Sequence, residues 1–507
     1  MGKPIARILD DLAAADPAHP LVTCAGTTVT RMELSTRSNR LARAYEALGV
    51  MQGDMVTIAL PNGIEFYAAA FAIWKLGATP QPVSHRLPAH ERAALIELAD
   101  AALVVGAPDG IHGDGIHGDS TYGGRPQVPI GFEPDPSISD APLEPVRVSP
   151  TWKALASGGS TGRPKLILDG ADGAPDPADR ARAFRLKDNG VQLVAGPLYH
   201  NSPFTYSMWG AFIGCHLVVL ERFDPVAALE AIEAHRVDWA LFVPTMMLRI
   251  LRVLEEQPGR YDLSSLETIW HLAAPCPPWV KEAWIDLVGP EKVMELYGST
   301  EGTAGTVISG QEWLSHRGSV GRTVMGSIRI LDPDGQELPA GEVGEIFMRR
   351  PEGAPPAYRY IGGEAVERDG WESVGDLGWF DEDGYLYISD RRTDLILSGG
   401  ANIYPAEVEA ALMEHPDIET CAVVGLPDED MGQRVHAVVQ ATSDVDVDEL
   451  RAFLADRLAH SKLPRSFRFV DDSLRDDAGK VRRSAVRDQE VALLAAAPGA
   501  PGAPGAP

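Results

Sequence analysis

The sequence predicts an α/β protein with a smaller α+β unit towards its C-terminal end. Residues 55–77 and 217–243 alternate strand-like apolar runs with segments that carry apolar residues at helical spacing. Residues 326–349 alternate apolar and polar positions, and the character of the chain changes again after residue 390. Because one core rarely serves 507 residues, we expect at least two domains.

The first half of the chain carries the pattern of helices packed over sheets. Met55–Leu60 is strand-like, and Pro61-Asn-Gly63 is a turn that leads into a helix over Ile64–Lys75. Asp224-Pro225 supplies an N-cap and a first-turn proline for a second helix. The alternation there predicts a strand, a helix and a strand over Leu217–Leu220, Val226–His235 and Trp239–Val243.

The second half adds two smaller units. Residues 326–349, with turns at Asp332-Pro-Asp-Gly335 and Pro339-Ala-Gly341, predict a small antiparallel β subdomain. After Asp390 we expect a compact α+β unit of about a hundred residues. Its predicted helices and strands are Pro405–His415, Thr420–Gly425, Arg434–Ala441 and Asp448–Leu458.

Two segments have no place in this pattern. Residues 110–119 read Gly-Ile-His-Gly-Asp twice in tandem, which could bind a metal through His and Asp or form a solvated glycine-rich loop. The tail, residues 491–507, ends in repeated Pro-Gly-Ala, and we expect it to be disordered and without a chemical role.

Composition excludes several classes of partner. A net charge of −27 argues against nucleic acid or an anionic membrane as the main partner. We expect no membrane insertion, because no apolar run approaches the ~20 residues needed to span a bilayer. The four cysteines are widely spaced and the N-terminus lacks the pattern of a secretory signal. These features predict a cytoplasmic protein.

The stretch Ser157-Gly-Gly-Ser-Thr-Gly-Arg-Pro-Lys165 lies between two strand-like runs and predicts a phosphate-binding loop. Glycines allow close backbone approach to a ligand, and hydroxyls and a lysine suit phosphate oxygens. The loop fails the Walker pattern, because its lysine follows Pro164 and no Ser or Thr comes next. A Gly/Ser linker is the alternative interpretation.

Further blocks follow in a fixed order, and together with this loop the chain resembles the adenylate-forming superfamily of acyl-CoA synthetases and related AMP-dependent ligases. The resemblance covers nearly the whole chain. Its blocks are Pro197-Leu-Tyr-His-Asn-Ser-Pro203, Ala273-Ala-Pro-Cys276, Tyr297-Gly-Ser-Thr-Glu301, Gly375-Asp-Leu-Gly378, Asp390-Arg-Arg-Thr-Asp394, Ser398-Gly-Gly-Ala-Asn-Ile-Tyr-Pro405 and Gly479-Lys480.

The resemblance implies a fold and an activity. It implies a large N-terminal adenylation domain over residues 1–390, made of two sheets flanked by helices plus the small β subdomain. A smaller, mobile α+β lid over 391–490 would follow. The implied reaction joins a carboxylic acid to AMP with release of pyrophosphate, and then to a thiol. The implied cofactors are ATP, Mg²⁺ and coenzyme A.

The same resemblance assigns the nucleotide site. Thr300 would contact the α-phosphate and Glu301 would bind Mg²⁺, because a carboxylate with phosphate oxygens is a usual magnesium site. Lys480 would bridge the carboxylate and the α-phosphate, although the residues before Gly479 depart from the family pattern. The remaining cofactor-binding residues are Ser157, Gly158, Gly159, Ser160, Thr161, Gly162 and Lys165 for phosphate, Ala274, Pro275 and Tyr297 for adenine, Asp376 and Arg391 for ribose, and Gly399 and Gly400 for pantetheine.

Simpler interpretations stay open for some of these residues. Asp376 could cap its own turn, and Lys480 could be an ordinary surface lysine. Cys276 is more readily a packing residue than a nucleophile. His200 is similar to a gate between the phosphate site and the acyl pocket, and a buried structural histidine is equally compatible with the pattern.

The acyl pocket is assigned by resemblance to Tyr206, Trp209, Gly210, Met246, Met247 and Gly298, each of which could equally be plain core. Paired Trp-Gly and Met-Met residues favour a wide apolar cavity, since methionine adapts to irregular shapes. The resemblance is strongest to bacterial synthetases for bulky polycyclic acids of bile-acid or terpenoid kind. A diterpenoid acid in secondary metabolism, such as antibiotic biosynthesis, would fit, and a fatty or aryl acid is the alternative.

The second half-reaction implies a rotation of the small domain about a hinge at Thr393, where the family commonly has Asp or Lys. CoA is the expected acceptor of the acyl group. An acyl carrier protein or a separate thiolating partner is the close alternative. A non-catalytic protein that binds nucleotide or acyl-AMP is an alternative of another class.

Overall fold

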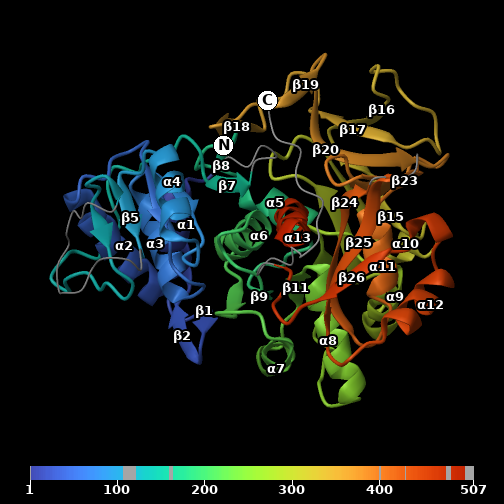
Figure 1. Ribbon diagram of the computed structural model, residues 1–507. Helices are drawn as coiled ribbons and strands as arrows, with labels where there is room; N and C mark the ends of the chain where they lie inside the picture. The colour runs from blue at the N-terminus through green and yellow to red at the C-terminus, as the bar shows by residue number, and fades with distance from the viewer. Residues whose placement is uncertain are drawn as a thin grey trace.

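The computed structural model describes residues 2–106, 122–158, 164–398, 401–428, 430–475 and 481–496. The duplicated segment 110–119 therefore lies outside the described residues. Figure 1 shows an N-terminal subdomain, a central region and a C-terminal domain in chain order from blue to red. Within the described ranges, no helix combines the length and apolar character that crossing a membrane requires.

The N-terminal subdomain is a small parallel sheet covered by helices. Its strand order is β4-β3-β5-β6, and every neighbouring pair is parallel. The predicted helix Ile64–Lys75 is confirmed as α3, which is almost wholly buried. The strands and the other helices are β3 (Met55–Ile58), β4 (Thr79–Pro82), β5 (Leu103–Val105), β6 (Gln127–Val128), α1 (Ile5–Ala15), α2 (Arg31–Ala47) and α4 (Ala89–Leu98).

A 14-stranded sheet forms the centre of the molecule. One half is parallel and runs in the order β13-β12-β11-β9-β10-β1, with β2 at the edge. The strands are β1 (Pro20–Cys24), β2 (Thr27–Thr30), β9 (Val191–Val194), β10 (His216–Val219), β11 (Trp239–Phe242), β12 (Thr268–His271) and β13 (Val293–Gly298). Helices α5 (Pro177–Ala183), α6 (Asn201–Phe212), α7 (Pro225–His235), α8 (Pro244–Glu256) and α9 (Pro278–Val288) alternate with them.

The order of these strands creates a crevice. The chain passes from β9 to β10 on one side and then crosses to β11 on the other side of β9. In open α/β sheets, ligands bind beyond the carboxyl ends of the strands at such a switch point. The predicted cap at the next helix is confirmed, because Asp224 accepts a hydrogen bond from the Ala227 amide at 2.9 Å. The switch between β9 and β11 therefore marks the first place to look for a site.

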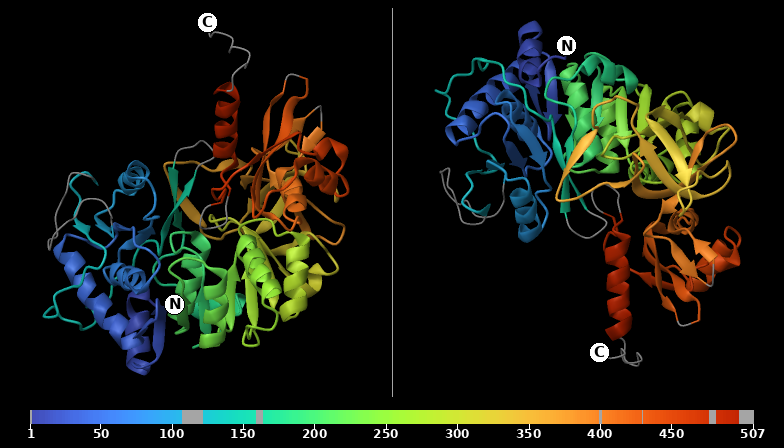
Figure 2. Two further views of the ribbon diagram at one scale, coloured as in Figure 1. Left: turned by 60° about the horizontal axis from the view of Figure 1, so that its bottom comes forward. Right: turned by 90° about the horizontal axis from the view of Figure 1, so that it is seen from above.

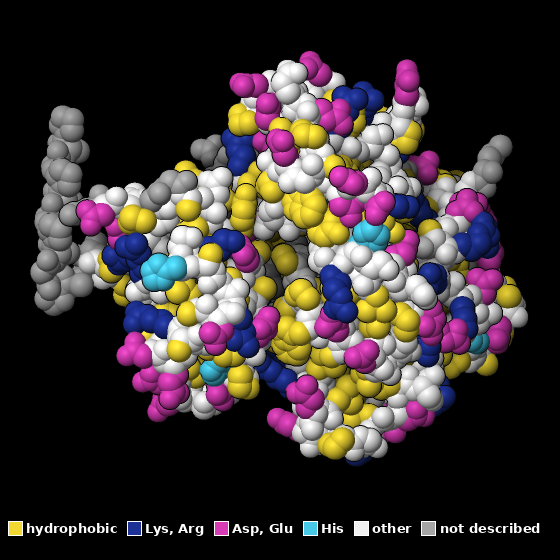
Figure 3. Space-filling view, turned by 90° about the vertical axis from the view of Figure 1, so that its right-hand side faces the viewer, with side chains coloured by type: hydrophobic (Ala, Val, Ile, Leu, Met, Phe, Trp, Pro, Cys, Tyr) yellow, Lys and Arg dark blue, Asp and Glu magenta, His cyan; other side chains and the backbone are white. Residues whose placement is uncertain are grey.

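The other half of the large sheet is antiparallel, as the sequence predicts. Strands β14 (Gly305–Ser309), β15 (Ser319–Met325), β16 (Ser327–Leu331), β17 (Gly344–Arg349), β19 (Val366–Arg368), β20 (Trp371–Phe380) and β21 (Leu386–Arg391) continue from β13, with α10 (Gly310–Trp313) between β14 and β15. The β subdomain is thus continuous with the central sheet. In Figure 3, acidic side chains spread over the face shown, mixed with basic and hydrophobic ones.

A third sheet of the large domain carries the edges of the phosphate loop. Its order is β18 (Tyr358–Ile361), β8 (Pro164–Asp169) and β7 (Ala154–Gly158), all antiparallel. Two sheets were expected for this domain, besides the β subdomain. Strand β4 of the N-terminal sheet lies beside β7, but the two strands are not joined by hydrogen bonds into one sheet. The reason is that β4 contains Pro80 and Pro82, and proline has no amide hydrogen to donate.

The C-terminal domain is the predicted α+β unit. It contains β22 (Ile396–Ser398), β23 (Ala401–Ile403), β24 (Ile418–Asp428), β25 (Gly432–Ala441) and β26 (Ser466–Phe469), with α11 (Pro405–Leu412) and α12 (Val447–Ala455) and a short 3-10 turn, His460–Lys462. In Figure 2 this domain lies beside the green and yellow part of the large domain, away from the blue subdomain. Arg249 and Arg252 of α8 bond Glu419 and the Ile418 carbonyl at 3.0 and 2.6 Å.

The C-terminal end differs from the prediction. Helix α13 runs over Arg483–Ala496 and packs on β24, so residues 491–496 are helical rather than part of a disordered tail. Ala and Leu, which are strong helix formers, make up most of 491–496 and extend the helix up to the repeats. Residues 497–507 lie outside the described residues.

A buried ion pair joins the three helices of the N-terminal subdomain. Lys75 of α3 contacts Asp10 of α1 at 2.5 Å and the Asn39 side-chain oxygen of α2 at 2.6 Å. Both charged side chains are at most 5% exposed. Burial lowers the pKa of Lys75 to about 8.

We expect Lys75→Met to lower the free energy of unfolding by about 3–5 kcal/mol, because it leaves Asp10 charged and buried without a counter-ion. Urea denaturation followed by circular dichroism measures the change. Lys3→Met is the matched control: the Lys3–Asp11 pair is about half exposed, and its loss is expected to cost less than about 1 kcal/mol. Equal stability of the two variants would contradict the assignment.

Candidate active site

The predicted site residues gather at the carboxyl edge of the parallel strands. Pro197–Pro203 follows β9, Ala273–Cys276 follows β12, and Tyr297 is the last residue but one of β13. Carboxyl ends of parallel strands meet at one edge of a sheet, so these three blocks share the crevice beside the switch point.

Tyr297 is tied to the two predicted ribose residues. Its hydroxyl donates to Asp376 Oδ2 at 2.8 Å, and Arg391 Nε lies 3.4 Å from Asp376 Oδ1. Burial raises the pKa of Asp376, and burial together with the Asp376 charge raises that of Tyr297. Asp376 lies on β20 and Arg391 ends β21, so the antiparallel half of the sheet supplies this wall.

Glu301 belongs to a second cluster. The Tyr360 hydroxyl donates to Glu301 Oε1 at 2.5 Å, and Lys165 Nζ lies 3.5 Å from the same oxygen. Lys165 also lies over the Tyr360 ring, 3.8 Å from its centroid. Burial, and then the bond to Glu301, raise the pKa of Tyr360. The predicted phosphate lysine and the predicted magnesium ligand are therefore in contact.

The turn between these clusters exposes backbone and hydroxyl groups. Thr300 is half-buried, and Ser299 Oγ is buried without a hydrogen-bond partner among the described residues. Ala273 adopts a left-handed backbone with φ of 77°, which costs energy in a residue with a Cβ. Ala274 is half-buried and Pro275 is exposed beside it.

His200 stands at the N-terminus of α6. Two anchors hold this segment in place. Asn62 accepts from the Leu198 amide at 2.8 Å and donates to the Gly196 carbonyl at 2.9 Å. Lys153 bonds the Asn201 and Thr205 side chains at 2.5 and 2.7 Å, and burial lowers the pKa of Lys153 to about 8. His200 is half-buried and packs against the Tyr199 ring.

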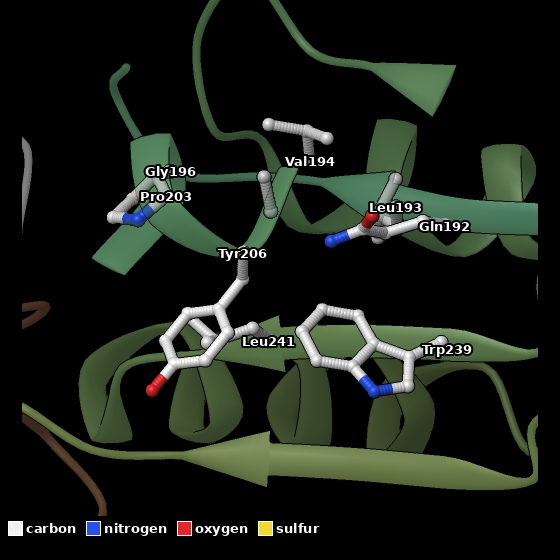
Figure 4. Close-up of a pocket in the computed structure, with 9 residues that line it drawn as sticks. Gln192, Leu193, Val194, Gly196, Pro203, Tyr206, Trp239 and Leu241 are labelled. Carbon is white, nitrogen blue, oxygen red and sulfur yellow. The ribbon is translucent and has the colours of Figure 1, made fainter. Parts of the chain in front are cut away.

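A narrow cavity lies between β9, β11 and α6 (Figure 4). Its volume is about 10 Å³, about enough for a single water molecule. The rings of Tyr206 and Trp239 face it, 6.1 Å apart. Its walls are Gln192, Leu193, Val194, Ala195, Gly196, Pro203, Tyr206, Trp239 and Leu241.

Of the predicted pocket residues that the structure describes, only Tyr206 borders this cavity. Trp209 packs in the core against Trp152, and Met246 and Met247 belong to a separate core under α8. Gly210 lies against Gln192, and Gly298 is exposed at the end of β13. Residue type and spacing do not reveal which way a helix or strand directs each side chain. The sequence alone therefore cannot separate residues that line this cavity from residues that pack in a core.

Some of the predicted phosphate, pantetheine and catalytic residues lie in segments that the structure does not describe. Gly159, Ser160, Thr161, Gly162, Gly399, Gly400 and Lys480 lie outside the described residues. Ser157 and Gly158 pair with Lys165 and Pro164 at the backbone, so strands border the loop on both sides as predicted.

Thr393 is exposed in the turn between β21 and β22, where the Asp394 amide bonds the Arg391 carbonyl at 3.0 Å. Arg483, which the sequence reasoning did not identify, connects this turn to the small domain. It bonds Asp394 at 2.9 Å and Glu409 at 2.8 Å. Tyr360, Gln192 and Lys153 were also missed, because none of them belongs to a recognisable block.

These groups fit a nucleotide with magnesium. Tyr297 offers a ring, Asp376 and Arg391 offer partners for hydroxyls, and the Ser299 hydroxyl has no hydrogen-bond partner among the described residues. Within the described residues no three His, Cys, Asp or Glu side chains are grouped as a metal site. A single carboxylate such as Glu301 suffices when phosphate oxygens complete the coordination.

Comparisons with known proteins agree with this geometry. The model of the AMP-binding enzyme family matches residues 9–356, and that of the AMP-binding enzyme C-terminal domain matches 407–480. Feruloyl-CoA synthase of an Amycolatopsis species is 33% identical over 487 residues, 94% of this chain and 96% of that protein. The 2-succinylbenzoate–CoA ligase of Bacillus licheniformis is 31% identical over 464 residues, 90% of this chain and 94% of that protein.

Solved structures extend the likeness to the fold. O-succinylbenzoate CoA synthetase from Bacillus subtilis with its acyl-adenylate intermediate has a TM-score of 0.80 at 27% identity, covering 96% of this chain and 99% of that one. The same enzyme with ATP and a magnesium ion has a TM-score of 0.78 with the same identity and coverage.

The predicted α/β fold with a large N-terminal and a small C-terminal domain is confirmed. The chain belongs to the AMP-binding enzyme family and is an AMP-forming acyl-CoA synthetase that uses ATP, Mg²⁺ and CoA.

Proposed function

We propose that this synthetase activates a hydrophobic carboxylic acid at the crevice beside the β9–β11 switch point and transfers the acyl group to CoA. One observation carries the proposal. The Tyr297–Asp376–Arg391 and Glu301–Lys165–Tyr360 clusters belong to blocks at the carboxyl edge of the sheet, and Gly196 and Pro203, which border the cavity, follow β9 at that edge. A nucleotide and an acid can therefore be held side by side.

The proposed roles follow from the chemistry of each group. Adenylation joins two anions, so it needs local positive charge. Lys165 and the residues 157–162 hold the outer phosphates, Tyr297 stacks on adenine, and Asp376 with Arg391 orients the ribose. Thr300 hydrogen-bonds the α-phosphate, and Glu301 is the protein ligand of magnesium. When bound, the metal disperses charge on the phosphate oxygens.

We propose that Lys480 and His200 act on the acid. Lys480 donates to the attacking carboxylate and the α-phosphate, while His200 borders the acyl pocket at its mouth. For thioester formation we propose that the small domain, residues 391–490, rotates about Thr393 and that Gly399 and Gly400 leave room for pantetheine. Arg483 marks the contacts that such a rotation would change, because it bonds Asp394 in the turn, Glu409 of the small domain and Asp390 of β21.

The acid class is proposed from the residues around the cavity and from the relatives. We propose a flat aryl acid, because the aromatic rings of Tyr206 and Trp239 border the cavity, which itself has room for about one water until a side chain moves. The two relatives named above are ligases for a succinylbenzoate and for a ferulate, both aryl acids. A bulky diterpenoid acid of secondary metabolism stays a prediction from sequence. Trp209 and Met247, which favoured it, pack in cores.

Two alternatives use the same site. The acyl group could pass to a carrier protein or a separate thiolating partner in place of CoA. A non-catalytic nucleotide-binding protein would tolerate loss of Glu301, Asp376 or Thr300, and all three are present. The free cysteines Cys24, Cys215, Cys276 and Cys421 support the proposal of a reducing, cytoplasmic location.

Pyrophosphate release tests the proposal. The enzyme is incubated with ATP and Mg²⁺ and a panel of aryl, fatty, bile and diterpenoid acids, with and without CoA. We expect release with aryl acids and acyl-CoA when CoA is added. Release without any thioester would favour a carrier protein or a partner, and ATP binding without release from any acid would favour the non-catalytic alternative.

We expect Lys480→Ala to abolish acyl-AMP formation and to leave thioester formation from supplied acyl-AMP largely intact, because the lysine acts in the first half-reaction. Each half-reaction is followed separately by chromatography. Lys462→Ala is the control, since Lys462 is a surface lysine of the same domain paired with Glu407. Equal loss of both half-reactions would overturn the assignment.

We expect Glu301→Gln to lower the rate of adenylation about 100-fold, about 2.7 kcal/mol, and to raise the magnesium concentration at half-maximal rate. The measurement is pyrophosphate release against Mg²⁺ concentration. Glu372→Gln is a matched control, because Glu372 also accepts a tyrosine hydroxyl, from Tyr358 at 2.9 Å. An unchanged magnesium dependence in Glu301→Gln would contradict its role.

We expect Tyr206→Ala to widen the cavity and to raise kcat/KM for a tricyclic diterpenoid acid, relative to cinnamic acid, about tenfold. The reason is that the Tyr206 ring lines the cavity beside Trp239, so its removal adds volume there. Steady-state kinetics with both acids gives the ratio, and a melting curve checks that the variant is folded. An unchanged ratio would place the acyl group elsewhere.

A further inference from the structure

Gln192 is the polar residue of an otherwise hydrophobic cavity. It lies on β9 directly beside Trp239 of β11, and its carboxamide points into the cavity (Figure 4). The residue is only 2% exposed. Its Oε1 makes no hydrogen bond to any described residue. A buried polar atom without a partner is rare in native proteins and calls for an explanation.

The fold makes room for this carboxamide at a cost. Gly210 lies inside helix α6, where glycine is unfavourable. A Cβ at Gly210 would come within 2.0 Å of Gln192 Oε1. The glycine is therefore needed for the carboxamide to occupy this place. Two residues from separate elements combine to hold an unpartnered oxygen beside the cavity.

The position of Gln192 sets what it can contact. Gly196, two residues beyond the end of β9, lies at the carboxyl edge of the sheet, where the predicted nucleotide residues gather. From residue 196 to residue 192 an extended chain spans roughly 13 Å. An acid that enters from this edge would therefore meet Gln192 at the end far from its reacting carboxylate. A planar ring needs the Tyr206 ring to turn aside, because the cavity itself has room for about one water.

We infer that Gln192 is a specificity-determining residue that recognises a hydroxyl at the far end of the acid substrate. The inference rests on the proposed function and adds a substrate class to it: a hydroxyaryl acid with its hydroxyl opposite the carboxylate. An acceptor without a partner requires a donor. A hydroxyl both donates and accepts, so it satisfies the carboxamide in either orientation of the amide.

The alternative is a structural glutamine that binds one water. The cavity volume of about 10 Å³ suits one water, and a substrate hydroxyl would then take its place. The two cases differ in what removal of the carboxamide does. A structural role affects all acids equally, whereas recognition affects only acids that carry the hydroxyl.

The test compares kcat/KM for three acids: 4-hydroxycinnamic, cinnamic and 4-methoxycinnamic acid, whose methoxy oxygen only accepts. We expect the wild-type enzyme to prefer the hydroxy acid about tenfold over each of the others. Gln192→Leu should abolish that preference by slowing the hydroxy acid and sparing cinnamic acid. Gly210→Ala, which leaves Gln192 in the chain but displaces its carboxamide, should reduce the preference in the same way.

Gln127→Leu is the matched control. Gln127 is fully buried on β6 of the N-terminal sheet, and both its polar side-chain atoms lack described partners. We expect melting temperatures of Gln192→Leu and Gln127→Leu to be equal to or above that of the wild type, since each removes unsatisfied buried atoms. Only Gln192→Leu should change the acid preference.

Three results would overturn the inference: no preference for the hydroxy acid in the wild type, an unchanged preference in Gln192→Leu, or an equal loss with all three acids. If no acid releases pyrophosphate, the proposed function fails first. Calorimetric binding of the 4-hydroxycinnamoyl and cinnamoyl sulfamoyl-adenosine esters then decides the inference. Tighter binding of the hydroxy ester, lost in Gln192→Leu, would support it, and equal binding would overturn it.

Discussion

The hydrogen bond from Tyr297 to Asp376 links the two halves of the central sheet. Tyr297 lies one residue before the end of the last parallel strand, and Asp376 lies in the antiparallel strand β20. Because Asp376 also pairs with Arg391, a single carboxylate connects Tyr297, the proposed adenine residue, to the start of the small domain. The proposed nucleotide site depends on this contact, since its parts come from regions that share no local structure.

A second contact of the same kind positions the phosphate side. Tyr360 belongs to β18, which pairs with β8, and β8 carries Lys165. This pairing brings Tyr360 and Lys165 together on Glu301. The Lys165 ammonium and the Tyr360 hydroxyl thus contact the same carboxylate oxygen of Glu301. The cavity beside β9 is lined by Gln192, whose Oε1 has no hydrogen-bond partner among the described residues. Under the proposed recognition of a substrate hydroxyl, this loss of stability is exchanged for selectivity among acids.

Sequence blocks identified polar residues that the structure brings into contact, and their roles stay predictions. Tyr297 lies near the end of β13, Glu301 follows that strand and Asp376 lies within β20, each in a short block that contains glycine. Tyr360 was out of reach, because its role comes from the pairing of β18 with β8 across almost two hundred residues. Trp209 and Met247 show the opposite problem: their types suit a pocket, but helix rotation directs them into cores. Gln192 belongs to none of the sequence blocks, so the sequence does not mark it as a site residue. The structure distinguishes it because its buried side chain borders a cavity and its Oε1 has no described partner.

The central claim is that the acid attacks the α-phosphate of ATP, so that one carboxylate oxygen leaves with AMP. The most direct measurement uses an acid with ¹⁸O in both carboxylate oxygens, followed by mass spectrometry of the nucleotide product. Attack at the α-phosphate gives AMP that carries one ¹⁸O, together with unlabelled pyrophosphate. Label in inorganic phosphate, with ADP as the product, would show attack at the γ-phosphate and contradict the account.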